Sequence, residues 1–291
     1  MAGSKQIVPY AKNVYDYQEI NAVVKTLKKT TQMSKNVSEF ENKIAQKFGY
    51  RYGVMVNSGS SAIMLCLKLL NFNSNDEIIV PCLNFGTAIS SILFFNLKPI
   101  LVDININTLQ IDEAKISNKI TKKTRAIMIP NLIGNIPKWQ LIRKIAKKNK
   151  LIVIEDSADT LGAKINNKPT GKYSDFAITS FYGSHIISCA GNGGMLMLKK
   201  ESYYKKARIL RSWGRLSSVL ADSENINKRL NIKIGGYEYD RKFIFEDLGF
   251  NIEPSELSAS FGLVQLKKFS KFEKLRKLNF NYHFNFFKRY E

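Results

Sequence analysis

The feature that most constrains the fold is a repeated alternation of short apolar runs with amphipathic stretches through the first 240 residues. The apolar runs show little polar–apolar alternation, which is typical of strands that are buried on both faces. Because strands that alternate with helices build parallel sheets covered by helices, the pattern predicts an α/β protein with a mostly parallel, seven-stranded sheet. The expected strands cover residues 53–57, 77–80, 99–103, 125–130, 151–155, 176–181 and 195–198.

The amphipathic stretches predict the helices and the division into domains. After residue 250 the alternation gives way to one helical stretch, and no internal repeat or low-complexity linker divides the residues before it. We therefore expect one large α/β domain over residues 1–250, and the start of a smaller helical domain over residues 251–291. The expected helices cover residues 16–30, 37–47, 61–70, 86–95, 139–148, 201–212 and 255–290.

Cysteine usage and hydropathy predict where the protein is located. The three cysteines, Cys66, Cys82 and Cys189, are widely spaced and form no Cys-x-x-Cys pair. This argues for a reducing compartment and against a disulfide framework or a zinc site, so we expect no bound metal. The first residues lack the apolar core of a signal peptide, and the most apolar run, 89–104, is too interrupted to span a bilayer. We expect a cytoplasmic protein without a membrane partner.

The formal net charge of +21 is the unusual feature of the composition. A basic surface can bind nucleic acid or an anionic substrate. The basic residues are scattered along the chain instead of forming one stripe, and Lys, Asn and Ile are all used heavily. This favours compositional bias, with an anionic small substrate as the alternative, and we expect no nucleic-acid partner.

Polar residues gather where two of the expected strands end. Residues 57–62 read Asn-Ser-Gly-Ser-Ser-Ala and open a helix, where free N–H groups favour a phosphate. Taken alone, this turn is a weak signal, because ordinary strand–Gly–Ser–helix connections are common and fit it better. Asp156 and Asp159 follow a buried strand, at the edge where ligands of open α/β sheets bind. A carboxylate there can hold a protonated ring nitrogen, although an Asp at a strand end is more often a helix cap.

In their order along the chain, several segments resemble one family of enzymes. From about residue 7 to its last residue, the chain resembles the DegT/DnrJ/EryC1/StrS family of pyridoxal-phosphate sugar enzymes. The resemblance implies the fold of aspartate aminotransferase, known as fold type I, with a small C-terminal domain that is present here in truncated form. The matching segments are residues 32–48, 57–62, 76–87, 99–103, 124–134, 154–162, 180–195 and 249–266.

The resemblance also implies a cofactor, partners and roles for individual residues. The cofactor is pyridoxal 5'-phosphate or its amine form, pyridoxamine 5'-phosphate, and the functional unit is a homodimer. Asp156 matches the carboxylate that keeps the pyridine nitrogen protonated, and Asp159 lies near the phenolic oxygen, where aminotransferase relatives often carry Gln. The other implied cofactor-binding residues are Gly59, Ser60 and Ser180 at the phosphate, Phe85 stacked on the ring, and Asn251 at the phosphate of the neighbouring subunit.

His185 decides which branch of this family the chain resembles. Residues 180–185, Ser-Phe-Tyr-Gly-Ser-His, match the segment in which aminotransferases carry the lysine that binds the cofactor covalently. An imidazole can move protons but cannot form an imine, so the resemblance is to the nucleotide-sugar 3-dehydratases with His at this position. Some of these carry an iron–sulfur cluster on cysteines that follow the Trp-Gly-Arg segment. Here residues 216–219 read Leu-Ser-Ser-Val, so we expect no cluster.

The implied activity is removal of the C3 hydroxyl of a nucleotide-linked 4-keto-6-deoxyhexose, in deoxysugar synthesis for surface polysaccharides such as O-antigen. His185 would be the catalytic proton carrier, and glutamate the amino donor that restores the amine form of the cofactor. Two alternatives stay open at this point. One is an aminotransferase of the same family that uses another base. The other is a non-catalytic or regulatory relative, against which the intact Asp156, Ser180 and Gly59-Ser60 argue.

Overall fold

A seven-stranded sheet forms the centre of the computed structural model, which describes residues 9, 12, 14–220 and 225–290. The strands are β1 (Tyr52–Val56), β2 (Glu77–Pro81), β3 (Lys98–Val102), β4 (Thr124–Pro130), β5 (Ile152–Asp156), β8 (Phe176–Ser180) and β9 (Gly194–Leu198). Their order is β1-β9-β8-β5-β4-β2-β3. Strand β9 is antiparallel to both neighbours, and the other adjacent strands run parallel. The predicted mostly parallel sheet is confirmed, with every strand end within one residue of its expected position.

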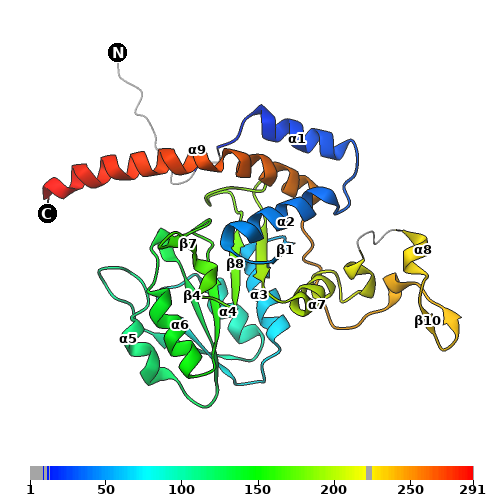
Figure 1. Cartoon of the computed structure of the whole chain (residues 1–291), viewed down its shortest axis with the longest axis horizontal. Coiled ribbons are helices and arrows are strands. Elements are labelled where there is room, and N and C mark those ends of the chain that lie inside the picture. Colours follow the sequence, from blue (N-terminus) through cyan, green and yellow to red (C-terminus); the bar gives the residue numbers. More distant parts are fainter. Residues whose placement is uncertain (1–8, 10–11, 13, 221–224, 291) are drawn as a thin grey trace.

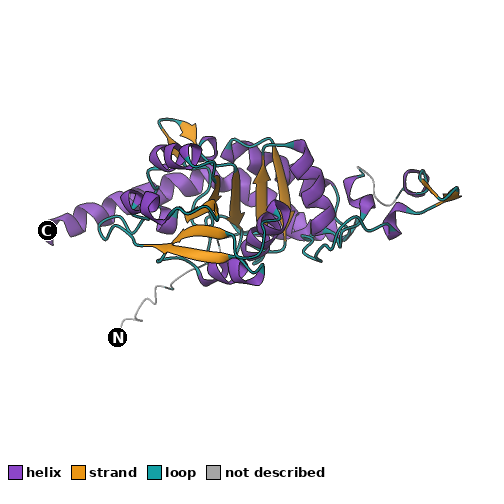
Figure 2. Cartoon of the chain, turned by 90° about the horizontal axis from the view of Figure 1, so that it is seen from below, coloured by secondary structure: helices purple, strands orange, loops and turns teal. Residues whose placement is uncertain are grey.

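Helices cover both faces of this sheet, as Figures 1 and 2 show. The helices are α1 (Tyr17–Leu27), α2 (Lys35–Phe48), α3 (Gly59–Leu70), α4 (Gly86–Phe94), α5 (Glu113–Ile116), α6 (Trp139–Lys148), α7 (Glu201–Arg211), α8 (Ile226–Arg229) and α9 (Glu256–Phe287). The seven predicted helices begin and end within three residues of the expected positions, and the largest differences are the ends of α1 and α9, three residues earlier than predicted. The one-turn helices α5 and α8 were not predicted.

The core lies in layers on the two faces of the sheet. Val54 and Val56 of β1 face a cluster that α3 and α7 cover, whereas Met55 between them faces α2 and α9. A third cluster packs α6 against β4 and β5 around Trp139, which is fully buried. Because neighbouring residues of one strand enter opposite clusters, both faces are apolar, and this explains the missing alternation in the sequence.

Helix α9 has a buried half and an exposed half. In its first half, Ala259, Leu263 and Phe269 belong to the cluster beneath α2, and Lys268 pairs with Glu19 of α1 at 2.6 Å. Its second half extends away from the sheet in Figure 1, and its residues from Glu273 to Tyr290 are exposed. The domain boundary expected near residue 250 stays a prediction.

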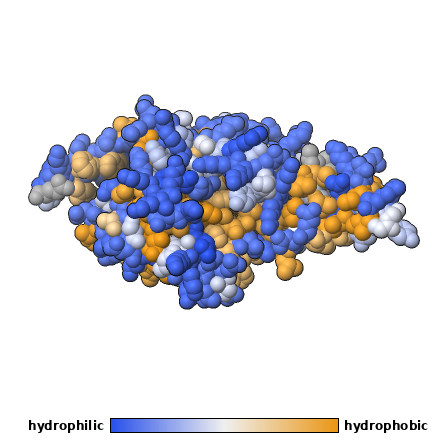
Figure 3. Space-filling model, turned by 60° about the horizontal axis from the view of Figure 1, so that its bottom comes forward, coloured by the Kyte–Doolittle hydropathy of each residue, from blue (hydrophilic) through white to orange (hydrophobic). Residues whose placement is uncertain are grey.

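A projecting arm, residues 225–248, was not predicted as structure. It holds α8 and a hairpin of β10 (Lys233–Ile234) and β11 (Tyr237–Glu238), whose strands are too short to give a period-2 signal. Another two-residue hairpin, β6 (Lys164–Ile165) with β7 (Lys168–Pro169), was missed for the same reason. Apolar residues gather on the arm in Figure 3. Those with large exposed side chains are Ile226, Leu230, Ile234, Tyr237, Tyr239, Phe243, Phe245 and Leu248.

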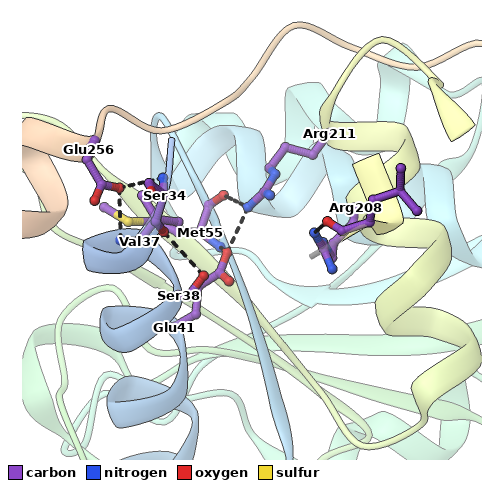
Figure 4. A network of polar contacts seen from close by, with 9 residues as sticks. Ser34, Val37, Ser38, Glu41, Met55, Arg208, Arg211 and Glu256 are labelled. Atoms are coloured by element: carbon purple, nitrogen blue, oxygen red, sulfur yellow. Dashed lines mark hydrogen bonds and ion pairs between the residues drawn. The ribbon is translucent and has the colours of Figure 1, made fainter. Parts of the chain in front are cut away.

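Two buried carboxylates join α2 to distant parts of the chain (Figure 4). Glu256 accepts the N–H groups of Ser34, Asn36 and Val37 at 2.7, 2.7 and 3.2 Å, so it caps α2 from more than 200 residues away. Such a carboxylate is favourable at a helix N-terminus, where the N–H groups lack intrahelical partners. Glu41 of α2 accepts both the N–H of Met55, at 2.8 Å, and a guanidinium N–H of Arg211, at 2.7 Å. These contacts fix β1, which leads into α3.

Candidate active site

The first turn of α3 lies directly against the end of β8. A Cβ atom added to Gly59 would come within 2.8 Å of the Cβ atom of Ser180, which is closer than side chains pack, so only glycine permits this approach. The Ser58 hydroxyl accepts the N–H of Ser61 at 3.0 Å. The N–H groups of Gly59 and Ser60 lie in the same first turn, where helix amides lack intrahelical partners. Together with the Ser180 hydroxyl, these groups can bind a phosphate.

Gly194 is a second glycine that this turn requires, and no role was predicted for it. A Cβ atom there would lie 2.1 Å from the carbonyl oxygen of Ser58, because the start of β9 passes directly behind the turn. The run of glycines between residues 191 and 194 was visible in the sequence. The reason why glycine is needed at residue 194 was not visible there, because the contact joins residues that are distant in the chain.

Asp156 is a buried carboxylate at the carboxyl end of β5, with 7% of its surface exposed. Its Oδ1 atom accepts the N–H of Ala158 at 3.0 Å, so it closes a local turn instead of capping a helix. Burial raises the pKa of Asp156 to about 7, although the hydrogen bond from Ala158 opposes the shift. The negative charges of Asp159 and Glu155 raise this pKa further. A cationic group placed beside Asp156 would therefore be strongly favoured.

This raised pKa predicts a specific pH dependence of stability in the protein without bound ligand. In the unfolded chain Asp156 has a pKa near 4, so its contribution to folding is complete below that value and is lost as the pH rises through 7. The Asn side chain of the Asp156→Asn variant cannot ionise. We therefore expect the free energy of unfolding of this variant, relative to that of the wild type, to increase by roughly 2 kcal/mol from pH 5 to pH 8. Urea unfolding at both pH values measures it.

A control of opposite sign is available for this measurement. Asp16 caps α1, and the N–H of Gln18 lowers its pKa. Asp16→Asn should therefore lose stability relative to the wild type as the pH rises through the acid range. An advantage of Asp156→Asn that is the same at pH 5 and pH 8 would contradict the raised pKa.

Asp159 and His185 form a pair beside Asp156. The Oδ1 atom of Asp159 lies 3.8 Å from Nδ1 of His185, while its Oδ2 atom accepts the N–H of Ile133 at 2.8 Å. The imidazole is about one-fifth exposed, and its Tyr182 neighbour contacts it edge-on. Burial lowers the pKa of His185, and the negative charge of Asp159 partly opposes this. At neutral pH the imidazole can therefore accept a proton.

The carboxylate of Glu155 holds the carboxyl ends of β4 and β5 together and was missed in the sequence. It is fully buried, and its oxygens accept hydrogen bonds from the side chains of Asn131, Ser157, Thr170 and Ser174. Asn131 is in turn held by the indole N–H of Trp139 at 2.9 Å. The backbone N–H of Asn131 also donates to the carbonyl of Asp156 at 2.8 Å. The sequence showed an acidic residue at a strand end, but its partners are spread over more than 40 positions.

The other predicted site residues lie at the rim. Phe85 precedes α4 with 70% of its side chain exposed, and Thr87 two residues later accepts a hydrogen bond from Ser60 at 3.1 Å. Asn251 is exposed, and the carbonyl of its neighbour Ile252 accepts the N–H of Asn57 at 3.1 Å. The structure thus brings Gly59, Ser60, Phe85, Asp156, Asp159, Ser180, His185 and Asn251 to one edge of the sheet.

The described residues contain neither a cluster of metal-ligating side chains nor a helix suited to a membrane. Within the described residues, no three His, Cys, Asp or Glu side chains are grouped so that they could hold a metal ion. No helix in that part of the chain combines the length and the apolar character needed to cross a membrane.

Comparison with known proteins assigns the chain and its fold to one family. The model of the DegT/DnrJ/EryC1/StrS aminotransferase family matches residues 14–290. The chain belongs to this family. The resemblance drawn from the sequence is therefore confirmed, and the architecture is that of a fold type I pyridoxal-phosphate enzyme.

The similar members of the family include both 3-dehydratases and GDP-perosamine synthases. The chain is 31% identical over 278 residues to GDP-4-keto-6-deoxy-D-mannose 3-dehydratase of Yersinia pseudotuberculosis, which covers 93% of this chain and 69% of that protein. The solved structure of the E. coli GDP-4-keto-6-deoxy-D-mannose-3-dehydratase with bound hydrated pyridoxal phosphate matches with a TM-score of 0.87 and 32% identity, over 96% of this chain and 72% of that one.

A second solved structure, a GDP-4-keto-6-deoxymannose-3-dehydratase with a trapped adduct of pyridoxal phosphate and glutamate, matches with a TM-score of 0.86 and 30% identity. It covers 96% of this chain and 73% of its own. Both structures thus match nearly the whole of this chain.

Proposed function

We propose that this family member is a pyridoxal-phosphate-dependent dehydratase that removes the C3 hydroxyl of a nucleotide-linked 4-keto-6-deoxyhexose. The observation that carries the proposal is His185, an imidazole where an aminotransferase has its cofactor-binding lysine, paired with Asp159 and next to the buried Asp156. The dehydratases to which the chain is similar support the reaction and the class of substrate. The pathway we propose is deoxysugar synthesis for surface polysaccharides.

The described residues fit the cofactor. The close approach of Gly59 to Ser180 leaves a cradle of N–H and hydroxyl groups that suits a phosphate. The exposed ring of Phe85 offers a flat face for a pyridine, and Asp156 offers a buried carboxylate for its protonated nitrogen. When bound, pyridoxal phosphate withdraws electron density from the carbon atoms attached to it, which lets protons and leaving groups depart.

His185 would move the protons of this reaction. Its Nδ1 atom faces the Asp159 carboxylate, an arrangement that favours the tautomer with the proton on Nδ1. The Nε2 atom then carries the free lone pair, and the lowered pKa keeps it unprotonated at neutral pH. The Nε2 atom can therefore take a proton from carbon and return it to the departing C3 hydroxyl as it leaves as water.

We extend the proposal to partners and location. Glutamate is proposed as the amino donor, in keeping with the trapped glutamate adduct of a similar dehydratase. A homodimer is proposed in which Asn251, exposed at the rim, contacts the cofactor phosphate of the partner. The cytoplasm is proposed as the location, because its reducing conditions suit the free thiols of Cys66, Cys82 and Cys189. We propose that neither a metal ion nor an iron–sulfur cluster takes part.

One spectroscopic experiment separates this function from its alternatives. The protein is mixed with pyridoxal phosphate, and its absorbance and intact mass are recorded before and after borohydride, then again with glutamate. We expect bound cofactor without a covalent adduct and conversion to the amine form by glutamate. Addition of a GDP-4-keto-6-deoxyhexose should then release ammonia, whose nitrogen comes from glutamate through the cofactor, together with the 3-deoxy sugar. A borohydride-trapped adduct on a lysine would instead assign an aminotransferase. A protein that binds no cofactor would be a non-catalytic relative.

A further inference from the structure

Ile133 has a backbone conformation that isoleucine rarely adopts. It lies in the short loop η2 (Leu132–Gly134), which follows β4, with φ of 50° and ψ of 25°. For a β-branched residue, this left-handed region is a strained outlier. The side chain is 64% exposed, so burial of the isoleucine does not offset the strain. Something else in the loop must hold this conformation in place.

The strained conformation directs one backbone group into the candidate site. The N–H of Ile133 donates a hydrogen bond of 2.8 Å to Oδ2 of Asp159. The other oxygen of the same carboxylate, Oδ1, is the atom that lies 3.8 Å from Nδ1 of His185. A carboxylate held at one oxygen has little freedom to rotate, so the Ile133 amide fixes the direction in which Asp159 faces the imidazole.

The loop itself is anchored on both sides of Ile133. The Gln110 side chain, only 4% exposed, donates to the carbonyl of Leu132 at 3.2 Å. Asn135 donates through its side chain to the carbonyl of Thr108 at 3.0 Å. Both anchors reach the segment that precedes α5, which lies outside the candidate site. They therefore hold the loop in place independently of Asp159.

We propose that Ile133 is a positioning residue whose left-handed backbone aims its N–H at Asp159 and thereby orients His185 for proton transfer. The inference deepens the function proposed above, because it rests on His185 as the proton carrier. The essential group is a backbone amide in a particular conformation. The isoleucine side chain has no part in it, so glycine should replace it without loss.

The test uses NMR titration of the two histidines in the protein without cofactor. The chain has only His185 and the exposed His283, so the second ring is an internal reference. Ile133→Gly keeps the N–H and adopts positive φ freely, so His185 should titrate as in the wild type. Ile133→Pro removes the N–H and fixes φ near −65°. It should lower the pKa of His185, in the same direction as Asp159→Asn, because the carboxylate is released from its fixed position facing the imidazole.

Kinetics and a milder variant complete the test. With GDP-4-keto-6-deoxymannose as substrate, Ile133→Pro should lower kcat about 10- to 100-fold with little change in KM, while Ile133→Gly should retain wild-type kcat. Gln110→Ala removes one anchor without altering η2 chemically and should shift both readouts in the same direction to a smaller extent. It carries the test if the proline variant fails to fold.

The outcomes separate this inference from the function on which it rests. If Ile133→Pro, or Gln110→Ala in its place, leaves the titration of His185 and kcat unchanged, the positioning role is wrong. Loss of activity in Ile133→Gly would show that the isoleucine side chain is needed for catalysis, and this result would also overturn the positioning role of the backbone amide. Full activity of a variant without His185 would overturn the proposed function instead, whatever the Ile133 variants do.

Discussion

Replacing His185 by Asn is expected to lower kcat for dehydration by about 10²- to 10⁴-fold, the usual contribution of general acid–base catalysis. In the wild type, Nδ1 of His185 lies 3.8 Å from Oδ1 of Asp159. The Asn side chain can still face Asp159, but its amide cannot accept and return a proton at neutral pH. Cofactor affinity should change little, because Gly59, Ser60 and Ser180 are untouched. Steady-state kinetics with GDP-4-keto-6-deoxymannose, together with the absorbance of the bound cofactor, measures both quantities.

The pH dependence of kcat in the wild type should also reflect the protonation of His185. Burial lowers the pKa of His185, so the unprotonated Nε2 atom persists to a lower pH than in an ordinary histidine. Activity should therefore fall only when the pH drops below the usual histidine range. His283→Asn is the matched control, because this histidine lies on the exposed half of α9. A His185→Asn enzyme that retains more than a tenth of wild-type kcat would show that another base carries the reaction.

Arg211→Met is expected to lower the free energy of unfolding by about 3–5 kcal/mol, because it leaves a buried carboxylate without its cation. Arg211 is 2% exposed, and one guanidinium nitrogen contacts both Glu41, at 2.7 Å, and the carbonyl of Met55, at 2.9 Å. Methionine has a similar length but cannot replace the charge or these hydrogen bonds. Because Met55 belongs to β1, affinity for pyridoxal phosphate should also fall. Urea unfolding and cofactor titration measure the two effects.

Two further variants test the cause of this loss. Lys205→Met breaks an exposed ion pair with Glu201, of similar length at 2.8 Å, and should leave the free energy of unfolding nearly unchanged because solvent screens the pair. In Glu41→Gln combined with Arg211→Met, no buried charge remains unpaired, so the double variant should be more stable than Arg211→Met alone. A loss below about 1 kcal/mol for Arg211→Met would mean that Glu41 is solvated or protonated in the folded protein.

The sheet could be predicted from the sequence because burial on both faces leaves a local signal. Continuous apolar runs such as residues 152–154 predict strands without knowledge of their neighbours. The two-residue hairpins carry no such signal, and the arm that includes β10 was missed. The family was predicted from the order of matching segments, and the predicted site rests on the same resemblance, with His185 as the informative departure from the aminotransferases.

Other parts of the site depend on contacts that no local pattern contains. Glu155 reads as one more acid at a strand end, and its donors come from four separate positions. The role of Ile133 is even harder to predict from the sequence, because a β-branched residue such as isoleucine disfavours the left-handed conformation that Ile133 adopts. Tertiary contacts overrule local preference there. Departures of this kind are expected where a loop serves a site.

The antiparallel strand β9 has a consequence for the order in which this chain is made. Among the strands of the described residues, β1, which leads into the Gly59 turn, pairs with β9 alone, and β9 lies about 140 residues later in the chain. At ordinary ribosomal speeds, this delay corresponds to roughly 7–28 s of synthesis. The amino-terminal portion of the nascent protein must therefore wait outside the exit tunnel with one strand unpaired. Cofactor capture should be a late event in biogenesis, possible only after Leu198 has emerged.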